Sequence, residues 1–121
     1  MIDLHSELKS TFKISKISDS QHDISITLPK NLSYFVGHFP QFPVLPSVAL
    51  IDITIYLTRL LDPSLAETYL KKIKYLKIKS PLGPDQKIKI QINQESASLF
   101  NAIWQHEGAA PIAEINFVFS L

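Results

Sequence analysis

The chain has 121 residues, of which 45% are hydrophobic and 19% charged, with no cysteine and a formal net charge of +1. This length predicts one domain over residues 1–121, large enough for a hydrophobic core without metal or disulfide support. The absence of cysteine excludes thiol catalysis, disulfides and thiolate metal sites. Because twelve Lys and Arg are balanced by eleven Asp and Glu, the overall charge predicts neither nucleic-acid nor membrane-surface binding.

The amino-terminal residues and the apolar runs indicate where the chain resides. Met1 to Glu7 include acidic groups where a secretory signal needs basic and then apolar residues. Asp52 interrupts the longest apolar run, and no run approaches the roughly 20 residues of a membrane span. We therefore expect a cytoplasmic protein with no membrane span.

The first quarter of the chain predicts a β-hairpin. Apolar and polar residues alternate over 8–17 and again over 22–28, where Ile24, Ile26 and Leu28 share a face. The polar residues 18–21 between these runs are typical of a turn. Pro29 then ends the second strand, because proline has no amide hydrogen to donate.

Residues 30–46 combine prolines with large apolar side chains. The prolines, together with Gly37, exclude regular structure over most of this segment. A solvated linker would be polar, whereas this segment is rich in Phe, Tyr, Leu and Val. It is predicted to be a packed, ordered loop of the kind that often carries function.

A helix and four strands are predicted for the remainder. Apolar residues surround the helix over Ser47–Leu61, which begins at Pro46 or Ser47 and ends at Asp62-Pro63, with a short helical turn expected over 64–68. A break in the apolar alternation predicts a bulge between Tyr75 and Leu76. The strands are expected over 69–80, 87–93, 99–106 and 112–121.

One packing requirement predicts the architecture. A helix that is apolar on nearly every side must be enclosed, and the strands are the elements available to enclose it. We therefore expect an α+β fold in which an antiparallel sheet wraps around one long central helix. Because a single sheet covers only part of a helix, the uncovered part is expected to meet another subunit, which predicts a dimer.

Three groups near the start of the helix suit proton transfer beside a carbonyl. His38, in the proline-rich loop, can remove a proton near neutral pH. Asp52 is the only acidic residue in the apolar helix, about 7.5 Å along the axis from Ser47, and can donate a proton. The first-turn amides of Ser47 and Val48 can hold negative charge on a carbonyl oxygen. Together they predict a dehydration, although each group alone would also suit a structural role.

The sequence Gly-His-Phe-Pro-Gln-Phe-Pro-Val-Leu-Pro over residues 37–46, with an acid fourteen positions after the histidine, resembles a known family. It is similar to the 3-hydroxyacyl-acyl-carrier-protein dehydratases of the hot-dog fold. Asp52 matches their β-hydroxydecanoyl branch, whereas another branch has Glu. The short length and the Phe-Pro-Val-Leu-Pro segment are also similar to small dehydratases of aryl polyene pigment pathways. The turn at Pro81–Asp85 resembles the family's Pro-Gly-Asp turn.

The resemblance implies residue roles. His38 would take the proton from C2 of a 3-hydroxyacyl thioester carried on acyl carrier protein, giving a trans-2-enoyl thioester in fatty acid or aryl polyene biosynthesis. Asp52 of the partner subunit would protonate the departing hydroxyl, and the backbone amide of Ser47 would bind the thioester oxygen. No metal or cofactor is implied.

The acyl chain would lie in an apolar tunnel along the helix. Its candidate lining residues are Phe39, Phe42, Val44, Leu45 and Tyr56, with core packing an equal alternative for the first four. The family usually has glycine at the position of Ser47 and glutamine at that of Tyr56. Because residues i and i+4 share a helix face, Tyr56 is expected either to hydrogen-bond the catalytic aspartate or to block the pocket.

Partners and competing functions follow from weaker features. Lysines are concentrated over 71–89 and either steer an acidic carrier protein or form an ordinary solvated face. The chain is expected to form a homodimer, or a heterodimer with a related dehydratase. Ser47 and Tyr56 leave open a non-catalytic subunit that partners an active dehydratase. An acyl thioesterase is the remaining alternative.

Overall fold

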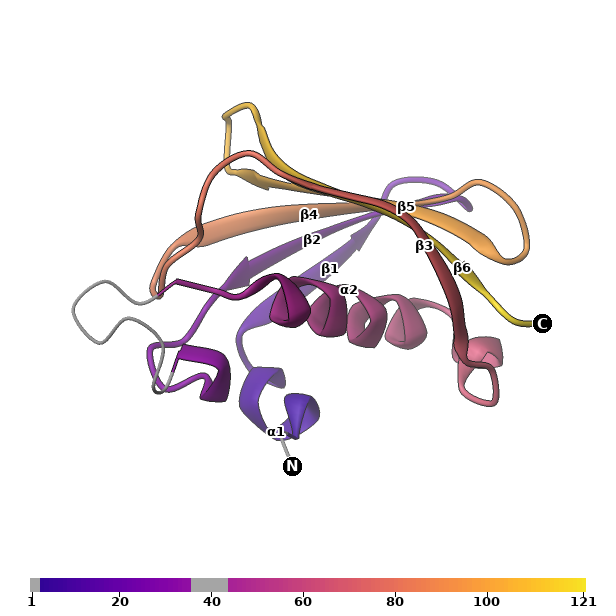
Figure 1. Ribbon diagram of the computed structural model, residues 1–121, viewed down its shortest axis with the longest axis horizontal. Helices are drawn as coiled ribbons and strands as arrows, with labels where there is room; N and C mark the ends of the chain where they lie inside the picture. The colour runs from indigo at the N-terminus through magenta and orange to yellow at the C-terminus, as the bar shows by residue number, and fades with distance from the viewer. Residues whose placement is uncertain (1–2, 36–43) are drawn as a thin grey trace.

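The computed structural model describes residues 3–35 and 44–121 (Figure 1). The elements in chain order are α1 (Leu4–Leu8), β1 (Phe12–Lys16), β2 (Gln21–Thr27), η1 (Ser33–Phe35), α2 (Ser47–Leu61), η2 (Pro63–Leu65), β3 (Leu70–Ile78), β4 (Lys87–Gln94), β5 (Leu99–His106) and β6 (Pro111–Phe119). Here η marks a 3₁₀ helix.

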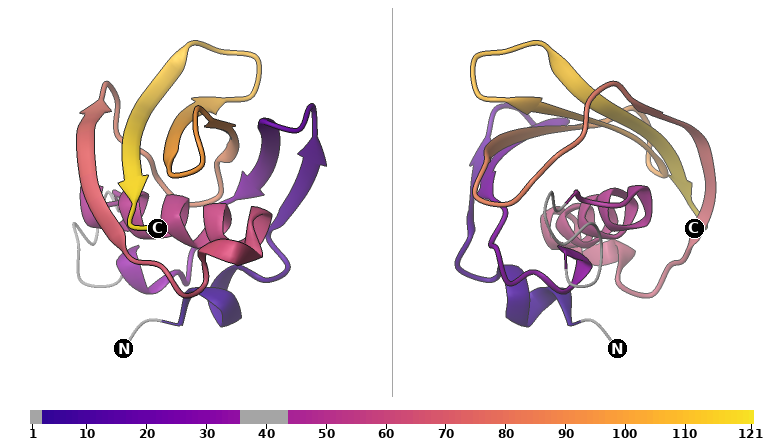
Figure 2. Two further views of the ribbon diagram at one scale, coloured as in Figure 1. Left: turned by 90° about the vertical axis from the view of Figure 1, so that its right-hand side faces the viewer. Right: turned by 60° about the vertical axis from the view of Figure 1, so that its left-hand side comes forward.

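The strands form one antiparallel sheet in the order β1-β2-β4-β5-β6-β3. The predicted hairpin is confirmed, since β1 pairs with β2 through a tight turn. The sheet curves over α2, which lies across its concave face (Figures 1 and 2). This arrangement is the predicted antiparallel sheet around one central helix.

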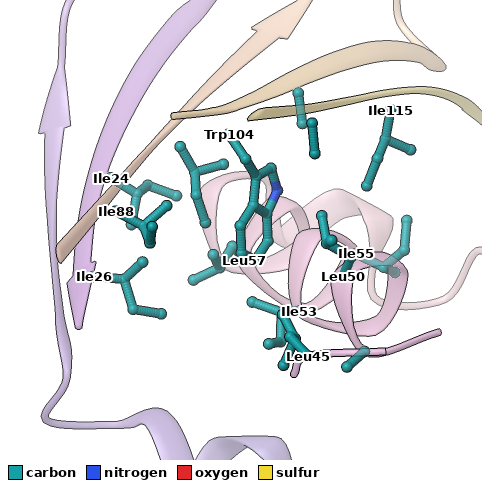
Figure 3. Close-up of a cluster of buried hydrophobic side chains, with 14 of the residues drawn as sticks. Ile24, Ile26, Leu45, Leu50, Ile53, Ile55, Leu57, Ile88, Trp104 and Ile115 are labelled. Atoms are coloured by element: carbon teal, nitrogen blue, oxygen red, sulfur yellow. The ribbon is translucent and has the colours of Figure 1, made fainter. Parts of the chain in front are cut away.

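The core lies between the sheet and α2. Every second residue of β2, β4, β5 and β6 points at the helix, as alternation predicts. On the helix, Leu50, Ile53 and Leu57 are fully buried and meet this surface (Figure 3). The buried sheet residues include Ile24, Ile26, Ile88, Ile90, Ile92, Phe100, Trp104, Ile115, Phe117 and Phe119.

Trp104 of β5 ties the sheet to α2 with a polar contact inside this core. Its indole Nε1 donates to Thr54 Oγ1 at 3.0 Å, and Thr54 Oγ1 donates to the Leu50 carbonyl at 2.7 Å. Both side chains are fully buried. Since every buried polar atom of this pair is satisfied, the contact fixes the position of α2 on the sheet without an unpaired group.

The sheet does not cover all of α2. Val48 and Leu60 are 55% and 42% exposed, and Ile51, Asp52 and Tyr56 are half-buried. In Figures 1 and 2, α1 and η1 lie on the side of the helix away from the sheet. The sheet therefore covers the helix only in part, as predicted. Asp52 lies on the side that the sheet leaves uncovered.

Two local predictions were wrong. A strand was expected to start at Leu8, but residues Leu4–Leu8 form α1, whose cap residue Asp3 accepts from Ser6 N at 3.3 Å and from Ser6 Oγ at 2.7 Å. The bulge in β3 was expected at Tyr75/Leu76, but the register shifts between Leu70 and Lys72 and between Ile73 and Tyr75.

The packing of β3 explains the second difference. Ile73 and Leu76 both pack against the core although their odd spacing would place them on opposite faces of a regular strand. An extra residue between them restores a common face. The outward-pointing Tyr75 then donates to Glu114 Oε2 at 2.6 Å and lies 3.1 Å from Asn101 Oδ1.

Candidate active site

Asp52 lies on the uncovered side of α2 and is hydrogen-bonded to a tyrosine. The hydroxyl of Tyr34, in η1, donates to Asp52 Oδ2 at 2.6 Å. Tyr34 is 8% exposed, whereas Asp52 is half-buried. Burial, followed by the hydrogen bond to Asp52, raises the pKa of Tyr34 above the usual range of a phenol. The phenol therefore remains protonated and acts as the donor.

Asp52 and Tyr34 both line a cleft of about 590 Å³. The volume is within the range of small-molecule sites. Its walls are mostly apolar, as an acyl chain requires. The remaining lining residues are Leu4, Ile51, Ile55, Tyr56, Arg59, Leu60 and Leu70.

Tyr56 lines the cleft but does not contact Asp52 through a hydrogen bond. Its hydroxyl lies 3.0 Å from His5 Nδ1, and burial raises the pKa of Tyr56. The first of the two expected roles of Tyr56, a hydrogen bond to the aspartate, is wrong in this structure. The physical reason is that α1, which the sequence pattern missed, brings His5 beside Tyr56, while η1 brings Tyr34 to Asp52.

Arg59 lines the same cleft, two turns of α2 further along than Asp52. Its Nη2 donates to the Thr68 carbonyl at 3.0 Å, and its guanidinium carbon lies 5.5 Å from the centre of the Phe119 ring. Its Nε is buried with no hydrogen-bond partner within the described residues. These contacts tie the last turn of α2 to the segment that leads into β3.

The amino-terminal end of α2 presents the expected amides. Pro46 is the cap residue and makes no side-chain cap bond, so Ser47 is the first helical residue and does not cap the helix. Backbone pairing begins with Ala49 N and Leu50 N, which both donate to the Pro46 carbonyl. Within residues 3–35 and 44–121, the amides of Ser47 and Val48 have no acceptor, and both residues are exposed.

The predicted tunnel residues that can be placed divide between two cavities. Val44 and Leu45 line a second cavity of about 300 Å³ with Leu50 and the end of β3, and neither lines the cleft of Asp52. Leu45 is buried and Val44 half-buried. His38, Phe39 and Phe42 lie outside the described residues, so their predicted roles remain predictions.

The described residues also bear on metal binding and on membrane insertion. No three His, Asp or Glu side chains there cluster in a way that could hold a metal ion. Among the helices described, none is long and apolar enough to cross a membrane.

The sequence matches the family model described as ApeI-like, ApeI dehydratase, over residues 14–111. The chain belongs to the ApeI-like dehydratase family. Its relatives include a protein of Anaeromyxobacter sp. (strain Fw109-5), named 3-hydroxyacyl-[acyl-carrier-protein] dehydratase FabZ, at 31% identity over 111 residues. That alignment covers 80% of this chain and 68% of the relative.

One further relative and one solved structure are similar to this ApeI-like chain. A protein of the same name from Myxococcus xanthus (strain DK1622) is 29% identical over 89 residues, which cover 68% of this chain. The chain spans 57% of that relative's length. The structure titled "The Dehydratase Heterocomplex ApeI:P from Xenorhabdus doucetiae" matches with a TM-score of 0.79 at 23% identity, covering 90% of this chain and 95% of that chain. This likeness shows the hot-dog fold.

Proposed function

We propose that the protein removes water from a 3-hydroxyacyl thioester carried on acyl carrier protein, giving a trans-2-enoyl thioester. The observation that carries this proposal is the carboxyl group of Asp52, held on an apolar helix in the wall of a cleft that suits an acyl chain. The family match over residues 14–111 supports it. We place the reaction in cytoplasmic fatty acid or aryl polyene biosynthesis.

The reaction needs one base, one acid and one oxyanion donor. His38 takes the C2 proton, and the electron pair left at C2 forms the C2–C3 double bond. The backbone amide of Ser47, at the positive end of α2, holds the negative charge that develops on the thioester oxygen. Asp52 gives a proton to the C3 hydroxyl, the C3–O bond breaks, and water leaves. Afterwards His38 releases its proton to solvent and Asp52 regains one, so the substrate has lost one water.

The helix geometry supports a site shared between two subunits. Ser47 and Asp52 are five residues apart, so their side chains leave the helix about 140° apart around its axis. The cavity beside Val44 and Leu45 and the cleft of Asp52 also have no lining residue in common. The free first-turn amides of one chain point out of the amino-terminal end of α2, whereas the Asp52 side chain leaves one flank of this helix, in the cleft. A second hot-dog subunit would bring the complementary group to each of these two places.

The charge of β3 bears on the identity of that second subunit. Lys71, Lys72, Lys74 and Lys77 lie on this edge strand and Lys79 follows it, all of them exposed. None of these lysines is in an ion pair within the described residues. Like charges that face each other across two strands are destabilising. Besides another copy of this chain, a related dehydratase with an acidic edge strand is therefore a candidate partner subunit. An acidic carrier protein is a further candidate to bind the same lysines.

The test is direct conversion of a 3-hydroxyacyl-carrier thioester, with enoyl formation followed by mass spectrometry. We expect turnover by the wild-type chain and its loss in His38→Ala and Asp52→Asn. Absence of turnover, or an unchanged rate in both variants, would contradict the proposal. Turnover that appears only after a related dehydratase is added would assign the chain the partner-subunit role. Free thiol release in place of enoyl product would indicate the thioesterase alternative, which the family match does not favour.

A further inference from the structure

Tyr34 is the residue that the structure places against the proposed acid. Within the described residues, the hydrogen bond to the Asp52 side chain comes from Tyr34 and reaches only one carboxyl oxygen, Oδ2. The other oxygen, Oδ1, has no donor among these residues. Tyr56, one turn further along α2, is engaged with His5. The two oxygens of Asp52 are therefore inequivalent.

We propose that Tyr34 is a positioning residue for the dehydration, because its hydroxyl occupies Oδ2 of Asp52 and so keeps the transferable proton on Oδ1. The inference rests on the proposed function. A carboxylic acid carries its proton on one oxygen, and the oxygen that already accepts a hydrogen bond is the poorer place for it. Oδ1 then presents the proton to the substrate hydroxyl, and the C3–O bond breaks as this proton is transferred.

The same hydrogen bond strengthens as the reaction proceeds. In the proposed reaction Asp52 gives its proton to the substrate hydroxyl, so its carboxyl group gains a negative charge in this step. A hydrogen bond to a charged acceptor is shorter and about twice as strong as one between neutral groups. Tyr34 therefore stabilises the product of proton transfer more than the reactant, and this difference lowers the barrier. Removal of the hydroxyl should lower kcat and leave substrate binding almost unchanged.

Hydrogen bonds of the neighbouring residue fix the turn that carries Tyr34. The preceding residue, Ser33, donates from its backbone N to Glu7 Oε1 at 2.6 Å and from its Oγ to Glu7 Oε2 at 2.9 Å. Glu7 belongs to α1, so two short elements distant in sequence fix the 3₁₀ turn that carries Tyr34. The tyrosine is thus preorganised before substrate arrives, as a positioning residue requires.

The experiment compares Tyr34→Phe with wild type in steady-state kinetics on a 3-hydroxyacyl-carrier thioester. Tyr69→Phe is the matched control, because Tyr69 is 65% exposed and its hydroxyl makes no hydrogen bond within the described residues. In Tyr34→Phe we expect kcat to fall by roughly ten- to a hundredfold, the range for a hydrogen bond to a charged group. KM should stay within about twofold, since only the transition state loses stabilisation. Tyr69→Phe should behave as wild type.

A second measurement needs no activity. Tyrosine labelled with ¹³C at Cζ reports the ionisation of each phenol, and the signal of Tyr34 is assigned by its disappearance in Tyr34→Phe. Because the contact with Asp52 contributes to the raised pKa of Tyr34, Asp52→Asn should move the titration of this signal to lower pH. Burial should still hold the pKa of Tyr34 above the usual range of a phenol in this variant.

The outcomes separate this inference from the proposed function. A wild-type chain without dehydration overturns the proposed function and the positioning role with it. An active wild type with an unchanged kcat in Tyr34→Phe overturns the positioning role alone. A Tyr34→Phe variant in which only KM changes does the same. A Tyr34 signal that titrates identically in Asp52→Asn contradicts the contact itself. A lower kcat at constant KM, together with the shifted titration, supports the inference.

Discussion

The buried contact between Trp104 and Thr54 should contribute measurably to stability, because it joins the sheet to the helix that carries Asp52. Trp104→Phe removes the indole donor and leaves Thr54 Oγ1 without the hydrogen bond it accepts at 3.0 Å. Loss of a buried partner costs about 1–3 kcal/mol. The smaller ring leaves a cavity at a fully buried position, which adds about 1–2 kcal/mol. We expect a total loss of about 2–5 kcal/mol in the free energy of unfolding.

A double-mutant cycle with Thr54→Val isolates the hydrogen bond from the cavity. Valine preserves the shape of threonine but removes its hydroxyl, so the single variant leaves the indole N–H of Trp104 unpaired. The double variant removes both partners and should cost less than the sum of the single variants by about 1 kcal/mol.

Urea unfolding at one fixed protein concentration, followed by far-UV circular dichroism, measures the cycle. Circular dichroism is needed because the chain has a single tryptophan, which two of the variants lack. The fixed concentration removes any effect of subunit association. A coupling energy near zero would refute the anchoring role of this hydrogen bond.

Three further predictions concern parts of the fold outside the core. Tyr75→Phe should lower stability by about 1 kcal/mol at neutral pH, since it removes the hydrogen bond to Glu114. That bond raises the pKa of Tyr75 to about 12, so the neutral phenol is favoured in the folded state. The stabilisation should be complete below about pH 10, the pKa of tyrosine in the unfolded chain, and be lost as the pH rises toward 12. The free energy of unfolding of wild type and Tyr75→Phe, measured as a function of pH, would show this loss. Gly108→Ala should cost about 1 kcal/mol in chemical unfolding, because φ is +74° and the added Cβ contacts nothing. A cost near zero would contradict the strain argument. Glu7→Ala should remove both hydrogen bonds from Ser33 and lower kcat less than Tyr34→Phe does; a larger effect would place the main constraint in α1.

Much of the fold is predictable from local sequence patterns. The helix over Ser47–Leu61 has the predicted bounds, and the hairpin and the later strands fall where alternation of apolar residues places them. These elements are long enough for their period to be unambiguous. α1 is missed because five residues are too few to show a helical period. The strand order is also outside the reach of periodicity, since β3 lies beside β6 and β2 beside β4.

The site is predictable in its chemistry and less so in its contacts. The motif leading to Asp52 identifies the family, and the exposed amides of Ser47 and Val48 follow from their place in the first helical turn. The partner of Asp52 does not follow, because Tyr34 lies 18 residues away and reaches it only through the packing of η1. A tyrosine four residues before His38 was visible in the sequence, but nothing local indicated where its hydroxyl would point. Tyr56, the neighbour expected from helical spacing, instead meets a helix that the pattern did not show.

Mixed dimers of His38→Ala and Asp52→Asn test the shared site most directly. Each variant alone should be inactive. After the two are unfolded together and refolded, about half of the dimers should contain one chain of each kind. If each site takes His38 from one chain and Asp52 from the other, every mixed dimer has one intact site. The mixture should then recover about a quarter of wild-type dehydratase activity. No recovery, with both variants folded and paired, would contradict the account.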